Sequence, residues 1–131
     1  AKWVKCNEAE LNTITGLINS NYKKIDQNVT NFLDHFGNES LLVTRGDKGA
    51  FWVSQNKTKA VIPGTPVTNL VNSVGAGDAF SAVLIMGMIF GWNNDESLRR
   101  ADEFASKLCQ KKGAIIRDQK IYDEFKYKWN L

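Results

Sequence analysis

Residues 72–80 read Asn-Ser-Val-Gly-Ala-Gly-Asp-Ala-Phe, and they lead into an apolar run that extends to Trp92. The small residues Gly75, Ala76 and Gly77 allow a ligand to approach the backbone closely. If a helix begins here, the free N–H groups of its first turn and the positive end of its dipole form a site for an anion such as phosphate. This stretch therefore predicts a phosphate site at the start of an apolar helix.

One carboxylate, Asp78, stands at this electropositive position. A carboxylate beside a phosphate is repulsive, and its natural function there is to accept the proton of an attacking hydroxyl group during phosphoryl transfer. The alternative is an ordinary first-turn acid that stabilises the helix by a few tenths of a kcal/mol. The residue pattern alone leaves both interpretations open.

Two other phosphate-binding motifs do not fit the same stretch. The pattern from Gly75 to Phe80 lacks the third glycine of the dinucleotide-binding fingerprint, and no Gly-Lys-Ser/Thr follows to complete a P-loop. A Rossmann dehydrogenase and a P-loop NTPase are therefore disfavoured.

The flanking sequence predicts an α/β protein with a partly parallel sheet and a hairpin. Asn7 with Glu10 matches a helix-capping pattern, and Gly46 and Gly49 bound a turn between two apolar runs. The expected strands are 3–6, 41–44, 50–53, 59–62 and 114–116, with an extended piece at 67–71. One expected helix starts at Asn7, a second covers 28–35 and stops at Gly37, and a third, buried helix covers 79–90. A fourth runs from a cap at Asn94 or Asp95 to about residue 112, before Gly113, and a fifth covers 121–129.

Composition excludes several classes of protein. The chain has 131 residues, 43% hydrophobic and 24% charged, with a net charge of +3, which suits one compact domain. Its basic residues are scattered, so nucleic-acid binding is disfavoured. The apolar run at 79–92 is shorter than the roughly 18 to 20 residues that span a bilayer, so no membrane segment is predicted. Cys6 and Cys109 lie far apart among apolar residues, and a reducing, cytoplasmic compartment is expected.

Four segments together resemble the ribokinase-like, or PfkB, family of carbohydrate kinases. Residues 72–80 resemble its C-terminal signature D-T-x-G-A-G-D-x-F, and Asn7-Glu8-Ala9-Glu10 resembles its N-x-x-E motif. Residues 44–50, Thr-Arg-Gly-Asp-Lys-Gly-Ala, resemble its T-x-G-x-x-G segment, and residues 105–114 are similar to the stretch that closes over adenine. The motifs occur in the family's order.

The resemblance implies the ribokinase-like three-layer α/β/α fold, of which residues 1–131 would be a single partial domain, the C-terminal nucleotide-binding portion. The family's remaining segments, with most of its sugar-binding residues, would precede Ala1, so the chain is expected to be inactive alone. It also implies ATP and Mg²⁺ as cofactors. The implied roles are a catalytic base at Asp78, an anion hole at Gly75, Ala76 and Gly77, nucleotide binding at Thr44, Gly46, Gly49, Ala105 and Gly113, and magnesium binding through water at Asn7 and Glu10.

Two positions depart from the family's pattern. Asn72 stands where the family usually has Asp, and Ser73 where Thr is common. Because relatives often use this loop in binding a monovalent cation, the loss of a carboxylate leaves activation by K⁺ open.

The function that the resemblance implies is ATP-dependent phosphorylation of a sugar hydroxyl. Residues 5–8 and 44–51 look like those of bacterial fructokinases, which makes fructose the first candidate; ribose, 2-keto-3-deoxygluconate and nucleosides such as adenosine are the alternatives. A non-catalytic nucleotide-binding module is a second hypothesis. The expected partners are the nucleotide and a small sugar, with no nucleic acid and no membrane, and the parent protein is expected to form a homodimer.

Overall fold

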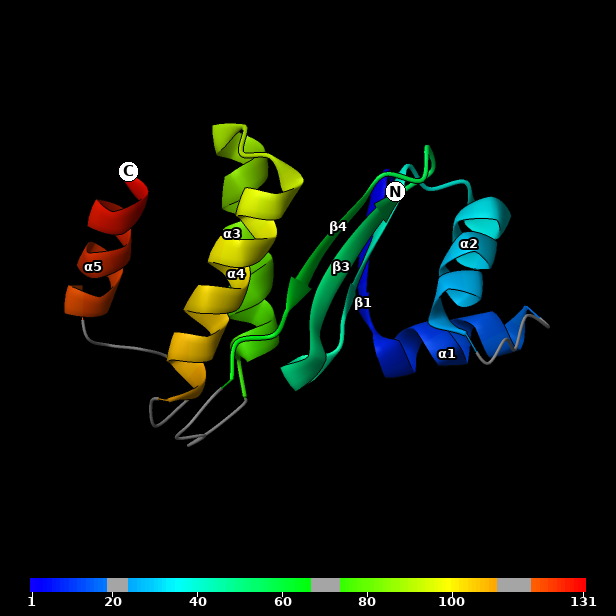
Figure 1. Ribbon diagram of the computed structural model, residues 1–131, viewed down its shortest axis with the longest axis horizontal. Coiled ribbons are helices and arrows are strands. Elements are labelled where there is room, and N and C mark those ends of the chain that lie inside the picture. The colour runs from blue at the N-terminus through cyan, green and yellow to red at the C-terminus, as the bar shows by residue number, and fades with distance from the viewer. Residues whose placement is uncertain (19–23, 67–73, 111–118) are drawn as a thin grey trace. The chain divides into compact units, whose positions relative to one another are not determined.

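The computed structural model describes residues 1–18, 24–66, 74–110 and 119–131. Its elements form two compact units, Ala1–Gly64 and Thr65–Leu131, each of which is considered by itself (Figure 1). The predicted extended piece at 67–71, the predicted strand at 114–116 and Gly113 lie outside the described residues.

A four-stranded mixed sheet forms the frame of the first unit. Its strands lie in the order β1-β2-β3-β4; β1 pairs with β2 in parallel, whereas β2–β3 and β3–β4 are antiparallel. The bounds are β1 Trp3–Asn7, β2 Ser40–Thr44, β3 Gly49–Ser54 and β4 Lys59–Pro63. The predicted partly parallel sheet and hairpin are confirmed.

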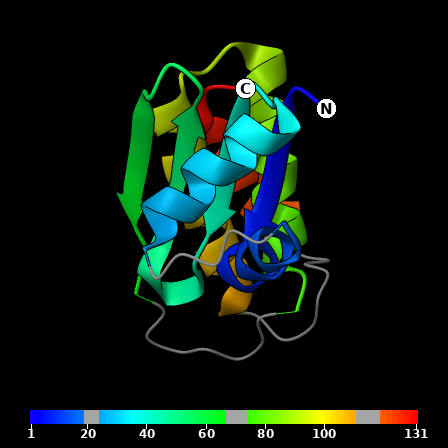
Figure 2. The ribbon, with the colours of Figure 1, turned by 90° about the vertical axis from the view of Figure 1, so that its right-hand side faces the viewer.

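Two helices, α1 (Glu8–Leu17) and α2 (Ile25–Phe36), cover the same face of this sheet (Figures 1 and 2). Their apolar residues and those of the inward face of the strands share one core. That core consists of Cys6, Leu11, Val29, Phe32, Leu33, Leu41, Val43 and Phe51.

The predicted start of α2 at residue 28 is wrong, because the helix begins at Ile25. Asn28 is buried inside the helix, where its side-chain amide donates to the Asn12 side-chain oxygen at 3.1 Å. The predicted end is confirmed: Gly37 has φ +66° and its N–H bonds to the carbonyl of Leu33.

A short 3₁₀ turn, η1 (Gly46–Lys48), joins β2 to β3. Gly49 follows it with φ +85°, and a Cβ added there would lie 2.1 Å from the Ile62 carbonyl oxygen. No residue with a side chain fits this position without moving backbone. Strand packing thus supplies a structural reason for Gly49 that is independent of any ligand.

The second unit contains α3 (Ala76–Phe90), α4 (Asn94–Cys109) and α5 (Gln119–Trp129). α3 and α4 pack closely because Gly87 has no side chain; a Cβ there would lie 2.4 Å from Ser97 Oγ. α5 contacts α4 through aromatic rings, with the Phe104 and Phe125 centroids 5.1 Å apart.

Both predicted limits of α4 require correction. The cap is Asn93, whose side-chain oxygen accepts from the Glu96 N–H at 2.8 Å, rather than Asn94 or Asp95. The helix ends at Cys109, short of the predicted residue 112. Neighbouring Asn and Asp residues are all competent caps, so the sequence could not decide among them.

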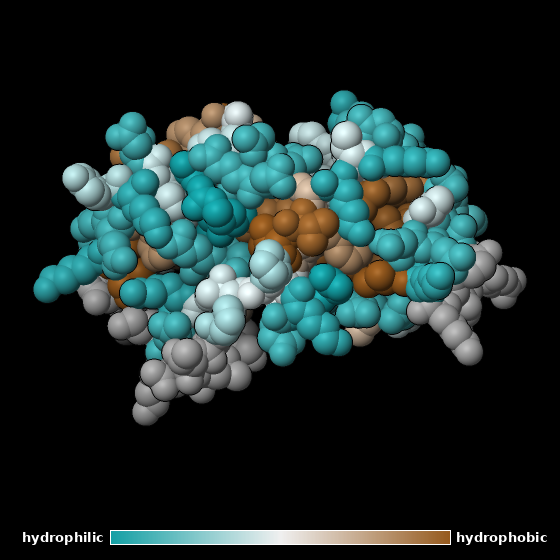
Figure 3. Space-filling view, viewed as in Figure 1, coloured by the Kyte–Doolittle hydropathy of each residue, from teal (hydrophilic) through white to brown (hydrophobic). Residues whose placement is uncertain are grey.

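The prediction that the apolar helix is buried is only partly right. One side of α3 is buried, through Phe80, Val83, Leu84 and Gly87. Ile85 and Ile89, on another side, are exposed. In the described ranges, no helix is both long and apolar enough to cross a membrane. The face drawn in Figure 3 is mostly hydrophilic, with separate hydrophobic patches.

Candidate active site

In the second unit, the candidate site residues lie at the start of α3. Gly75 precedes the helix with φ +84°, a conformation that favours glycine, and no side chain of the described residues caps the helix there. The first helical bond runs from the Ala79 N–H to the Gly75 carbonyl at 2.9 Å, so the N–H groups before Ala79 have no intrahelical acceptor. Backbone donors at Ala76 and Gly77 can therefore bind an anion.

Asp78 lies in the first turn of α3 and is exposed. Ser81, one turn later, donates its hydroxyl to the Gly77 carbonyl at 2.8 Å and thus does not compete for the carboxylate. The helix start therefore presents backbone N–H donors and an accessible carboxylate within a single turn. Such a pair can hold an anionic group and accept a proton from a hydroxyl beside it.

In the first unit, considered by itself, the candidate site residues lie at the carboxyl ends of the parallel strands. Asn7, the last residue of β1, is the register partner of Thr44, the last residue of β2. Thr44 is also paired with Ala50 of β3, just after Gly49. The N-x-x-E and T-x-G-x-x-G segments thus meet at the carboxyl ends of β1 and β2, the end of open α/β sheets at which ligands bind.

Asn7 and Glu10 form a reciprocal capping box at the start of α1. The Asn7 side-chain oxygen accepts from the Glu10 N–H, and one Glu10 carboxylate oxygen accepts from the Asn7 N–H, both at 2.8 Å. Helix capping is therefore confirmed for both residues. One carboxylate oxygen of Glu10 takes no part in this box and can still accept a hydrogen bond from a metal-bound water.

This donor set suits magnesium bound mainly through water. The described residues contain no group of three His, Cys, Asp or Glu side chains that could enclose a metal ion. Mg²⁺ keeps several waters and is held by one or two protein groups together with substrate phosphates. An exposed amide and an exposed carboxylate at Asn7 and Glu10 fit such an outer role.

Cys6, a free cysteine, precedes Asn7 and is buried. Burial raises the pKa of its thiol from 9.0 to about 11; the Glu10 carboxylate also raises this pKa, and Lys5 acts in the opposite direction. The raised pKa keeps this thiol protonated near neutral pH, as is usual for a buried structural cysteine.

The predicted site residues fall into two groups, one in each unit. In the first unit, Gly46 has φ +58° with open space around its Cα, so, unlike Gly49, it leaves room for a ligand. In the second unit, Ala105 is buried on α4. The group in the first unit is Asn7, Glu10, Thr44, Gly46 and Gly49, and the described group in the second unit is Gly75, Ala76, Gly77, Asp78 and Ala105. Gly113 and Asn72 lie outside the described residues.

Two contacts were not predicted from the sequence. The Thr65 N–H and hydroxyl both donate to one carboxylate oxygen of Asp102, which fixes the backbone at the start of the second unit. Arg45, between Thr44 and Gly46, lies with its guanidinium carbon 5.3 Å from the Phe51 ring centroid and donates to the Lys48 carbonyl at 3.1 Å. No capping or turn motif in the sequence singled out Thr65, Asp102 or Arg45.

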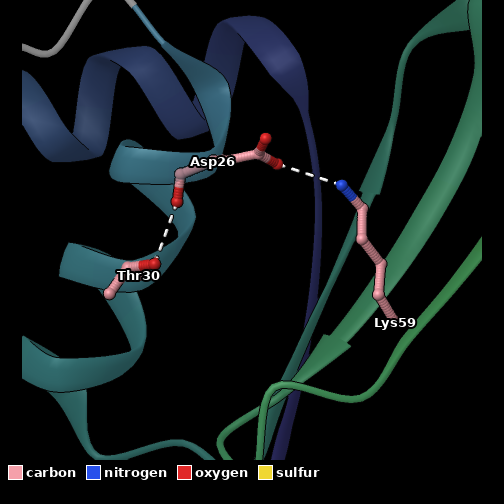
Figure 4. A network of polar contacts seen from close by, with 3 residues as sticks. All are labelled: Asp26, Thr30 and Lys59. Carbon is pink, nitrogen blue, oxygen red and sulfur yellow. Dashed lines mark hydrogen bonds and ion pairs between the residues drawn. The ribbon is translucent and has the colours of Figure 1, made fainter.

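A depression of about 360 Å³ lies on α2 and is lined by Asp26, Gln27, Thr30 and Asn31. Asp26 pairs with Lys59 of β4 at 3.0 Å, and Thr30 donates to the Asp26 carbonyl at 3.0 Å (Figure 4). The charges of this exposed pair neutralise each other, and an exposed pair contributes little to stability. None of the predicted site residues lines this depression.

Comparison with known proteins gives a consistent family. The family model described as pfkB family carbohydrate kinase matches residues 1–121. A ribokinase from Arabidopsis thaliana is 34% identical over 109 residues, which are 83% of this chain and 28% of that protein. A deoxyribokinase from Salmonella typhi is 30% identical over 107 residues, or 82% of this chain and 34% of that protein.

Solved structures show the same fold. A ribokinase from Thermotoga maritima matches with a TM-score of 0.81 at 23% identity, over 95% of this chain and 41% of that chain. The Arabidopsis thaliana ribokinase, solved with ribose and ATP, matches with a TM-score of 0.79 at 29% identity, over 95% of this chain and 40% of that chain. A protein from E. coli assigned as ribokinase II, in complex with ATP and Mg²⁺, matches with a TM-score of 0.74 at 23% identity, over 98% of this chain and 40% of that chain.

These matches confirm the ribokinase-like α/β fold. They also show that the chain spans about two-fifths of the length of the solved structures. Its share of the two curated relatives is about a third or less.

Proposed function

The chain belongs to the pfkB family of carbohydrate kinases, and on that premise we propose that it is the nucleotide-binding and catalytic-base portion of a kinase acting on a small carbohydrate. The reaction is transfer of the γ-phosphoryl group of ATP to a sugar hydroxyl. The observation that carries this proposal is the exposed Asp78 carboxylate, placed in the same helical turn as the uncapped N–H groups that follow Gly75.

At this turn the backbone and the carboxylate have separate tasks. The N–H groups at Ala76 and Gly77 stabilise the negative charge of the transferring phosphoryl group. Asp78 accepts the proton of the attacking hydroxyl, and its exposure leaves room for the sugar. In-line transfer needs little more from the protein than position, charge stabilisation and this proton acceptor.

Asn7 and Glu10 would hold the hydration shell of Mg²⁺. The ion neutralises part of the triphosphate charge when it is bound. We further propose that Thr44 and Gly46 contact the nucleotide, because Thr44 lies beside Asn7 in the sheet and Gly46 is open. The remaining nucleotide-binding residues of the proposal are Gly49, Ala105 and Gly113.

The choice of sugar rests on a resemblance of two segments and on the names of the relatives. Residues 5–8 and 44–51 resemble bacterial fructokinases, which favours fructose. Relatives at 30% identity or more include proteins named ribokinase and deoxyribokinase, which favours a pentose, and one assigned as a 1-phosphofructokinase, which favours a fructose derivative. The proposal is therefore a kinase of small sugars, with fructose, ribose and deoxyribose tested first and 2-keto-3-deoxygluconate and nucleosides tested next.

A second candidate function rests on the short span of the chain. Since it covers about 40% of its solved relatives, it is proposed to bind nucleotide without turnover when it is alone. The buried free thiols of Cys6 and Cys109 suit the cytoplasm, where we place the protein. We also propose that residues 1–131 form a single partial domain and that the parent protein is a homodimer. Its activation by K⁺ stays an open proposal.

Calorimetric titration with Mg-ATP, followed by a coupled assay for ADP release with each sugar, tests both functions. Saturable nucleotide binding without ADP release supports the binding module, whereas ADP release with one sugar supports the kinase. Absence of binding to Mg-ATP, both alone and together with the rest of a ribokinase-like fold, would contradict both.

A further inference from the structure

Arg45 lies between Thr44 and Gly46, two residues that we propose to contact the nucleotide. Its backbone closes the turn η1: the Arg45 N–H donates to the Gly49 carbonyl at 2.8 Å, and the Arg45 carbonyl accepts from the Lys48 N–H at 3.1 Å. Its side chain folds back over the same turn and donates through Nη2 to the Lys48 carbonyl at 3.1 Å. Arg45 thus closes the turn with both its backbone and its side chain.

The turn η1 has few anchors of its own. Its hydrogen-bond geometry is poorer than that of an α-helix, because it is a 3₁₀ segment of a single turn. Gly46, Asp47 and Lys48 are all exposed, so none of their side chains packs into the core. Gly64, just after β4, limits the turn at Asp47, since a Cβ on this glycine would lie 2.4 Å from the Asp47 carbonyl oxygen. The Arg45 side chain holds the turn at Lys48.

A buried aromatic ring fixes the Arg45 guanidinium in place. Phe51 of β3 is 2% exposed and belongs to the core of the first unit. The guanidinium carbon lies 5.3 Å from the Phe51 ring centroid, within the range of a cation–π contact. A planar guanidinium can stack on a ring and donate in its own plane at the same time, whereas an ammonium group cannot. The side chain therefore links the core to the turn.

An ion pair does not explain the position of Arg45. Among the described residues, no carboxylate pairs with it, and its buried Nε has no hydrogen-bond partner. Lys59, whose Nζ lies 5.0 Å from the same Phe51 ring, instead pairs with Asp26 at 3.0 Å (Figure 4). The contacts with Phe51 and with the Lys48 carbonyl therefore determine where the guanidinium lies.

We infer that Arg45 is a positioning residue for the nucleotide: its guanidinium, held by Phe51, fixes the turn η1 in the shape that leaves Gly46 open. It acts through the turn and does not itself touch the nucleotide. The inference rests on the proposed function, because it takes Gly46 as a nucleotide contact. Substitution of Arg45 should loosen the turn and, as a consequence, weaken the binding of Mg-ATP.

Three substitutions separate positioning from charge. Arg45→Met keeps an apolar stem against the ring but removes both the charge and the donor. Arg45→Lys keeps the charge but lacks the planar fork that reaches the ring and the carbonyl together. Lys48→Met is the matched control, because it removes an exposed charge from the same turn and leaves the backbone carbonyl that Arg45 uses.

Hydrogen exchange of the Gly49 amide, which donates to the Gly46 carbonyl, reports on the turn without any ligand. We expect its protection factor to fall by about fivefold or more in Arg45→Met and in Arg45→Lys, and to change by less than about twofold in Lys48→Met. The Val43 amide of the central strand β2 should keep its protection, which distinguishes local opening from general destabilisation. Unchanged protection at Gly49 in both Arg45 variants would overturn the inference.

Calorimetric titration with Mg-ATP gives the second readout. Both Arg45 variants should bind about tenfold more weakly than the unaltered chain, and Lys48→Met should bind within about twofold of it. Unaltered affinity in both Arg45 variants would contradict the positioning role. Full affinity in Arg45→Lys alone would also contradict it and would assign the effect to charge.

A failure of the proposed function gives a different result. If the unaltered chain does not bind Mg-ATP, either alone or joined to the rest of a ribokinase-like fold, the proposed nucleotide site is contradicted. The exchange of the Gly49 amide needs no nucleotide, so it still decides whether Arg45 holds the turn.

Discussion

Asn7, the last residue of β1, lies opposite Thr44, the last residue of β2, in the parallel pair of strands. Asn7 also caps α1 through the Glu10 N–H. One residue thus fixes the helix that follows β1 and stands beside the segment proposed to contact the nucleotide. Its helix-capping role and its proposed magnesium role can be separated by the choice of substitution.

Replacing Asn7 with Ala should lower the free energy of unfolding by about 1 kcal/mol, because the cap of α1 is lost. Asn7→Ser retains a capping oxygen and should leave urea unfolding nearly unchanged. If Asn7 also holds magnesium waters, Asn7→Ser will weaken Mg²⁺-dependent ATP binding without loss of stability. Identical magnesium dependence in Asn7→Ser and the unaltered chain would confine Asn7 to capping.

The contact between α3 and α4 gives a prediction about packing. Gly87→Ala places a Cβ 2.4 Å from Ser97 Oγ, and overpacking of this kind costs about 1 to 3 kcal/mol. Gly16→Ala in α1 is the matched control, since nothing lies within 4 Å of its added Cβ. That change should be neutral or stabilising by up to about 1 kcal/mol. Thermal unfolding of the two variants should therefore shift in different directions; equal shifts would contradict the close approach.

Alanine substitutions at Gly49 and Gly46 distinguish a backbone requirement for glycine from a role in ligand contact. Gly49→Ala would force its Cβ to within 2.1 Å of the Ile62 carbonyl oxygen, so we expect a loss above about 3 kcal/mol or failure to fold. Gly46→Ala meets only the positive φ of +58° and should cost about 1 kcal/mol. Chemical denaturation measures both. A folded, stable Gly49→Ala variant would disprove the structural explanation of this glycine.

The raised pKa of the Cys6 thiol predicts how the free energy of unfolding changes at alkaline pH. Burial raises the pKa of its thiol from 9.0 to about 11 in the folded chain, with the Glu10 carboxylate raising it as well. Between these values the unfolded thiol loses its proton while the folded one keeps it, so the free energy of unfolding should fall as pH rises from about 9. Cys6→Ala should flatten this decline, as measured by urea unfolding between pH 8 and pH 10.5, and an unchanged decline would exclude Cys6 as its source.

Much of the first unit was predictable because its signals are local. A hairpin is indicated by two apolar runs, 41–44 and 50–53, which a turn at 46–49 connects. A helix start is indicated by Asn7 with Glu10. The start of α2 was not predictable, because Asn28 resembles a cap but is buried within the helix and bonds to Asn12. Tertiary packing outweighed the local preference there.

The helix start at residues 75–78 was predictable for a different reason. The residue types and spacing of Gly75 and Asp78 indicate the start of a helix, and both residues lie at the start of α3; their roles in phosphoryl transfer stay a prediction. The exposure of Ile85 and Ile89 was missed because the apolar run at 79–92 shows how hydrophobic the helix is, but not which of its sides are covered. Contacts such as Thr65 with Asp102 join distant parts of the chain, and no local pattern reports them.

The proposed role of Asp78 is tested most directly by the turnover of Asp78→Asn in the chain joined to the remaining portion of a ribokinase-like fold, assayed with Mg-ATP and the preferred sugar. We expect turnover to fall by about 10²- to 10⁴-fold, because the proton acceptor is lost. ATP binding should be kept, and Asp95→Asn, a first-turn acid of α4, should behave like the unaltered protein. Turnover of Asp78→Asn within a few-fold of the unaltered protein would contradict the assignment of Asp78 as the catalytic base.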